Sequence, residues 1–73
     1  LAINAANDGD RILVSNLTTL NETDTIDKSL TIISQVSGQS VDFTGDIYIK
    51  ANSSIEIRII GFLIKGGSII ALN

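Results

Sequence analysis

Three asparagines stand in the pattern Asn-X-Ser/Thr, which accepts N-linked glycans when X is not proline. They are Asn16, Asn21 and Asn52. The first two fall in a polar stretch, residues 16–28, where an attached glycan would be accessible. A chain this rich in Asn, Ser and Thr yields about one or two such triplets by chance. The pattern therefore names candidate glycosylation sites and leaves their use open.

Other residues with chemical potential are sparse. The chain has no His and no Cys, so a serine nucleophile would lack its usual base. The closest carboxylate pairs are Asp8 with Asp10 and Asp24 with Asp27. A calcium loop needs roughly six oxygen ligands in a fixed order, and Asp8-Gly9-Asp10 matches a turn better. We predict no catalytic residue, no metal site and no cofactor.

Two further pairs of residues have a functional and a structural explanation. Glu56 and Arg58 lie two apart on one strand face, which indicates a solvated charge pair on an outer surface more than a catalytic dyad. Phe43 and Tyr48 could stack a sugar ring, so carbohydrate is a candidate partner. With one Tyr and two Phe in the chain, filling a core or covering a sheet explains them better.

Composition narrows the class of protein. A chain of 73 residues forms one domain at most, and 44% hydrophobic against 18% charged residues argues against disorder. Five scattered basic residues and a net charge of −3 argue against a nucleic-acid partner. The longest apolar stretch, residues 59–64, is far below the roughly 20 residues of a membrane-spanning helix. A first residue other than Met suggests a processed product, and we expect an extracellular or cell-surface location.

The strand pattern is the strongest structural signal. Ile55, Ile57 and Ile59 alternate with Glu56 and Arg58, which is typical of a strand with one buried face. Similar short runs, closed by Gly, Asn, Ser or a charge, predict strands near residues 11–15, 30–34, 41–43, 47–49, 55–60, 62–64 and 68–72. We predict one domain over 1–73, with a cap and turn over 1–10, β-coils over 11–73 and a polar excursion over 16–28.

Residues 8–14, 28–34 and 52–62 together resemble the opening coils of right-handed parallel β-helices of the pectate-lyase-like superfamily. Closely spaced glycines and an overlay of residues 28–34 on 53–59, at an offset of about 25, fit such a solenoid. The resemblance implies a short capping helix at the N-terminus. The family's catalytic residues lie on later coils, so none is carried over. We therefore predict an all-β fold, a short parallel β-helix or β-solenoid with a small N-terminal helical cap; the alternative is a β-sandwich.

A short solenoid exposes strand edges and core at its ends. A helical turn at residues 1–7 could cover one end, whereas the C-terminal segment should seek another chain; its residues are Ser68, Ile69, Ile70, Ala71 and Leu72. The leading hypothesis is a structural subunit of an extracellular self-assembling layer, sheath or filament, with copies of itself as partners. One competing hypothesis is an N-terminal fragment of a polysaccharide-binding or polysaccharide-cleaving β-helix. A β-sandwich adhesion module is the third.

Overall fold

The structure is a computed structural model that describes residues 1–50, 52 and 54–72. This part of the chain contains strands and no helix. The strands are β1 (Asp10–Val14), β2 (Leu20–Asn21), β3 (Asp24–Ile26), β4 (Leu30–Ser34), β5 (Val41–Thr44), β6 (Ile47–Lys50), β7 (Ile57–Ile60), β8 (Phe62–Ile64) and β9 (Ile69–Leu72).

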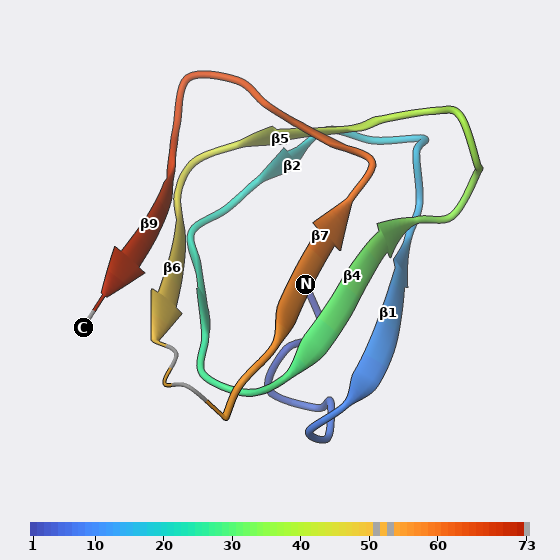
Figure 1. The fold of residues 1–73 in the computed structure, drawn as a ribbon. Helices are drawn as coiled ribbons and strands as arrows, with labels where there is room; N and C mark the ends of the chain where they lie inside the picture. The colour runs from blue at the N-terminus through green and yellow to red at the C-terminus, as the bar shows by residue number, and fades with distance from the viewer. Residues whose placement is uncertain (51, 53, 73) are drawn as a thin grey trace.

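The strands form three parallel sheets that enclose one core (Figure 1). Sheet A has the order β1-β4-β7, sheet B the order β2-β5-β8 and sheet C the order β3-β6-β9. Each strand therefore stacks on the strand three places earlier in the sequence, and each coil of three strands lies on the previous coil. This is a short β-solenoid. The β-sandwich alternative is wrong, because its strands would pair antiparallel, whereas all of these ladders are parallel.

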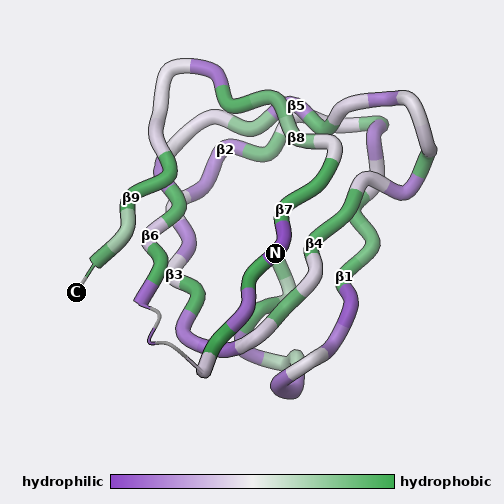
Figure 2. Tube along the Cα trace, in the orientation of Figure 1, coloured by the Kyte–Doolittle hydropathy of each residue, from purple (hydrophilic) through white to green (hydrophobic). Residues whose placement is uncertain are grey.

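The core forms because the inward residues of successive coils stand in register. Leu30 pairs with Ile57, and Ile32 lies between Ile12 and Ile59. The middle coil supplies most of the fully buried side chains, which are Leu30, Ile32, Val41, Phe43 and Ile47. Hydrophobic stretches accordingly lie in strands of all three sheets (Figure 2). The chain gains its apolar burial by placing one coil between two others.

The corner between sheets B and C is built on two glycines. Gly45 has φ of +112°, a left-handed conformation that favours glycine. A Cβ at Gly45 would lie closer than 3.0 Å to the carbonyl oxygen of Glu22, and one at Gly67 equally close to that of Gly45. The three corner residues thus stack with their backbones in direct contact, which only glycine permits in the second and third coils.

The predicted N-terminal helical cap is wrong. Residues 1–7 form a single turn in which the Ala6 N–H donates to the Ile3 carbonyl at 3.2 Å. The turn around Gly9 stops the segment before it reaches the length at which a helix propagates. The segment still covers the core, because Ile3 is buried within it. Lys28 holds the segment by donating to the carbonyls of Ile3 and Ala6, each at 2.9 Å.

Two further expectations need correction. The polar stretch 16–28 contains β2 and β3, so much of it belongs to the first coil. The offset between residues 28–34 and their partners one coil later is 27, since Leu30 pairs with Ile57, and not about 25. A shift of two residues keeps every side chain on the same face, so alternation alone could not distinguish the two registers.

Candidate functional site

The two ends of the solenoid differ, and the difference defines the candidate site. At the N-terminal end, β1, β2 and β3 are edge strands, but Ile3 is buried in the core cluster and Leu1 and Ala6 pack against it, so the core is covered there; we call this the closed end. At the C-terminal end, β7, β8 and β9 are the last strands of their sheets. Along one side of each of these strands, no backbone pairing occurs among the described residues. We call this surface the open end.

The open end exposes side chains that belong to the core. Ile57 and Ile59 lie in register with Leu30 and Ile32, yet they are only half-buried. Ile69 shows the contrast most clearly, because it is 47% exposed, whereas its partner in the middle coil is fully buried. The remaining inward residues of the last coil are Phe62, Ile64 and Ala71. The open end is therefore an apolar cross-section bordered by free strand edges, which strand pairing with another polypeptide can cover.

The predicted assembly edge, Ser68 to Leu72, corresponds to β9 and the residue before it. The Ile47 N–H donates to the Ser68 carbonyl at 2.9 Å. Because successive residues of a strand point their N–H and C=O groups to opposite edges, Ile69 and Ala71 direct theirs to the free side. Ile70 faces outward over Tyr48, and Leu72 stands over Lys50.

Sequence reasoning missed that β7 and β8 share this edge with β9. Their inward residues, Ile57, Ile59, Phe62 and Ile64, are half-buried like those of β9. The alternation of Ile57 and Ile59 with Arg58 carried the signal for one dry face. The alternation identifies the buried face of a strand but does not show whether a further coil covers it, so the exposure of this face was not predictable from it.

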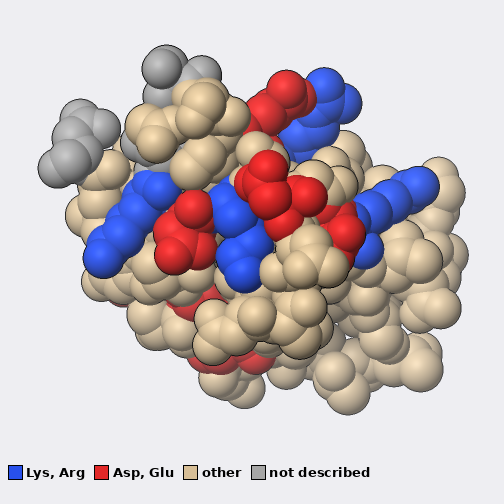
Figure 3. Space-filling view, turned by 90° about the horizontal axis from the view of Figure 1, so that it is seen from below, with Lys and Arg blue, Asp and Glu red and all other residues tan. Residues whose placement is uncertain are grey.

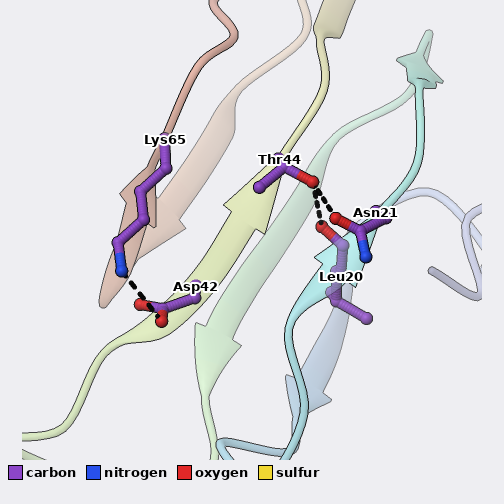
Figure 4. Close-up of polar contacts among 5 residues, drawn as sticks. All are labelled: Leu20, Asn21, Asp42, Thr44 and Lys65. Atoms are coloured by element: carbon purple, nitrogen blue, oxygen red, sulfur yellow. Dashed lines mark hydrogen bonds and ion pairs between the residues drawn. The ribbon is translucent and has the colours of Figure 1, made fainter.

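Charges surround the coils without converging on a site. Acidic and basic side chains are interleaved on the side of the molecule seen from below (Figure 3). Arg58 pairs with Glu56 at 2.6 Å, and both side chains are largely exposed, as predicted for a surface pair. On sheet B, Lys65 reaches Asp42 of the preceding coil at 3.1 Å (Figure 4). Only the Lys65–Asp42 pair joins neighbouring coils, and neither pair gathers charges of one sign at one place.

The three candidate glycosylation sites lie in different environments. Asn16 is half-buried; its Nδ2 donates to Ser34 Oγ at 2.6 Å and its Oδ1 accepts from the Val36 N–H at 3.1 Å. Asn21 is exposed and its Oδ1 contacts Thr44 Oγ1, which leaves Nδ2 outside that contact (Figure 4). Asn52 is exposed, while the middle residue of its triplet, Ser53, lies outside the described residues. Geometry thus favours Asn21 over Asn16 as an acceptor.

A carboxyl pair lies beside the closed end. Asp24 stands in register with the buried Ile47, and its Oδ2 has no hydrogen-bond partner in the described part of the chain. Burial, followed by the proximity of Glu22, raises the pKa of Asp24 to about 6. Asp24 and then the N-terminal ammonium lower the pKa of Glu22, which pairs with that ammonium. The pair gives this end a group that titrates at mildly acidic pH.

Within residues 1–50, 52 and 54–72, no three His, Cys, Asp or Glu side chains gather as metal ligands would. No helix in the described residues is long and apolar enough to span a membrane. The class that fold and site define is a parallel β-solenoid of three coils with one closed and one open end. No family model, no curated protein and no solved structure matches the chain.

Proposed function

We propose that the chain is a structural subunit of an extracellular layer, sheath or filament, in which the open end pairs with β-strands of another copy. The supporting observation is the half-exposed core of the last coil, with Ile69 47% exposed beside a free strand edge. Parallel coils bury such residues by adding a further strand layer. Copies of this chain carry matching apolar edges, so they are the proposed partners.

The closed end determines which contacts copies can make. A copy stacked on the N-terminal coil would have to displace Ile3 from the core and break both hydrogen bonds of Lys28. Head-to-tail stacking is therefore disfavoured, and pairing between two open ends is favoured. Such a contact is isologous and closes on itself as a pair. A layer or filament then needs a second contact elsewhere on the surface.

Ala71→Pro tests the role of the open end. Proline removes an N–H that points to the free edge and leaves the bonds between β9 and β6 in place, and edge strands tolerate proline. Ala71→Ser, which keeps the N–H, is the matched control. We expect size-exclusion chromatography and electron microscopy to show assemblies for the native chain and Ala71→Ser, and smaller species for Ala71→Pro. Equal assembly by all three would refute pairing through this edge.

The second candidate function also has a specific observation in its favour. One closed and one open end is what the N-terminal coils of a longer right-handed β-helix of the pectate-lyase-like superfamily would show. The chain would then be part of a polysaccharide-binding or polysaccharide-cleaving protein whose site lies on later coils. A purified 73-residue chain that is monomeric and poorly folded by circular dichroism would favour this function over the structural one.

A further inference from the structure

A carboxyl group occupies an inward position of the first coil. Asp24 on β3 stands in register with Ile47, which is fully buried, and it shares a face with Ile26, two residues further along the strand. Oδ2 of Asp24 is buried and has no hydrogen-bond partner in the described part of the chain. In the third coil the same column continues with Ile69. The first coil therefore places an ionisable group where the other two coils place isoleucine.

Residues 1–6 lie over the first coil, and we call them the cover. The N-terminus lies within the outline of the three sheets (Figure 1), and Ile3 is 4% exposed among the core side chains. Few polar contacts hold the cover: its ammonium pairs with Glu22, and Lys28 donates to the carbonyls of Ile3 and Ala6. The cover belongs to no strand, so it can leave the first coil without breaking a strand pairing.

Asp24 and the cover differ in how firmly their backbones are held. β3 pairs with β6, and the Asp24 N–H donates to the Asp46 carbonyl at 3.0 Å. The cover instead joins the first coil through a turn, in which the Asn7 N–H donates to Asp10 Oδ2 at 2.8 Å and the Asp10 N–H to the Asn7 carbonyl at 3.0 Å. Strain between Asp24 and the cover is therefore relieved by movement of the cover about this turn, and not by movement of β3.

Ionisation of Asp24 places a second negative charge beside Glu22. Burial, then the Glu22 carboxyl, raise the pKa of Asp24 to about 6, and the N-terminal ammonium opposes them. Two carboxyl groups this close share one proton, so protonated Asp24 donates to Glu22. The neighbouring charges are engaged elsewhere: the Asp46 carboxylate accepts the Ser68 N–H, and Lys28 holds carbonyls of the cover. The N-terminal ammonium pairs with Glu22, so ionised Asp24 gains no donor among the described residues.

We propose that Asp24 is an acid-dependent latch for the cover: the protonated carboxyl keeps residues 1–6 closed over the first coil, and ionisation releases them. In the released state water reaches both Asp24 oxygens, so the charge is no longer buried. The equilibrium constant for opening should therefore rise as pH rises from the usual pKa of 3.8 to the raised pKa of about 6, by about 100-fold in total, and level off above it. The latch goes beyond the proposed function, because it controls the closed end.

Release of the cover changes which contacts copies of the chain can make. It bares the inward side chains of the first coil beside the free sides of β1, β2 and β3. The consequence for assembly, unlike the latch itself, rests on the proposed function. Stacking of an open end on the first coil of another copy, which the closed end disfavours, becomes more favourable as pH rises from 4 to 7.

The test measures the exposure of residue 3 by thiol labelling with dithiodipyridine between pH 4 and pH 7. The chain has no Cys, so Ile3→Cys places one thiol on the buried side of the cover, and Leu17→Cys, at a residue 92% exposed, corrects for ionisation of the thiol. We expect the ratio of the two labelling rates to rise about 100-fold in the native background and to stay constant with Asp24→Asn. Glu22→Gln should shift the midpoint to lower pH, because it removes the neighbouring carboxyl. Glu56→Gln, at a side chain 70% exposed, is the matched control and should keep the native profile.

Low concentrations of urea distinguish opening of the cover from unfolding of the whole chain. Opening of the cover exposes little surface, so labelling of Ile3→Cys at pH 7 should hardly depend on urea, whereas global unfolding depends on it steeply. Labelling that rises with urea as global unfolding does, a ratio that stays flat from pH 4 to pH 7, or an unchanged profile in Asp24→Asn would each overturn the latch. None of these outcomes depends on assembly, so the proposed function is tested separately by Ala71→Pro.

Discussion

The glycine corner between sheets B and C permits a quantitative test of the solenoid. Gly66 has φ of +71° with no atom near an added Cβ, so Gly66→Ala introduces backbone strain alone. Gly67 lies outside the left-handed region but faces the Gly45 carbonyl, so Gly67→Ala introduces a steric clash alone. Gly45→Ala introduces both, because φ is +112° and the Glu22 carbonyl lies in the way.

The expected losses of unfolding free energy follow from these contacts. Left-handed alanine costs about 1 kcal/mol, which is the loss expected for Gly66→Ala. To relieve the clash at Gly45, the first two coils must move apart at this corner. There the Glu22 N–H donates to the Thr44 carbonyl at 3.1 Å, and the Asp24 N–H donates to the Asp46 carbonyl at 3.0 Å. At about 1 kcal/mol for each weakened bond, Gly45→Ala should lose about 3 kcal/mol and Gly67→Ala about 2 kcal/mol.

Thermal unfolding followed by circular dichroism measures these losses. In a domain of this size about 1 kcal/mol corresponds to roughly 4–8 °C in Tm. We therefore expect a fall of about 5 °C for Gly66→Ala and about 15–20 °C for Gly45→Ala. Equal losses for Gly45→Ala and Gly66→Ala would refute the direct backbone contact between coils, because strain alone would then account for both.

Three more results are expected. Ile3→Ala should cost about 2–4 kcal/mol in a urea titration, as for a core residue, while Leu17→Ala should cost almost nothing; similar small losses would show that the end is not closed. The raised pKa of Asp24 means that the folded chain binds more protons between the usual 3.8 and about 6, so stability falls as pH rises through that window. Asp24→Asn should therefore be more stable than the native chain at pH 7 and equal to it near pH 4; a constant difference would contradict the assignment. Peptide mapping of a chain secreted by a glycosylating host should find glycan on Asn21 and none on Asn16, whose amide holds Ser34; glycan on Asn16 would contradict that contact.

The strands with strong alternation were predictable from the sequence. β4, β5, β6, β7, β8 and β9 all lie within or near the predicted runs, because isoleucine at period 2 specifies both a strand and its buried face. β2 and β3 were missed because Asn, Asp and Thr dominate residues 16–28. Pairing with the next coil, through Leu20 on Phe43 and Ile26 on Ile49, recruits these residues into strands. Local composition cannot report such a long-range contact.

The candidate surfaces were less predictable than the strands. The outward column of Leu13, Ile33 and Ile60 on sheet A was hidden because Ile33 and Ile60 each adjoin an inward isoleucine, so the paired apolar residues suggested burial on both faces. The lysine that ties residues 1–7 to the core is Lys28, more than 20 residues away in the sequence. Its partners are backbone carbonyls, which carry no side-chain signature. Register and backbone contacts, rather than residue type, thus decide which apolar residues of this chain face water.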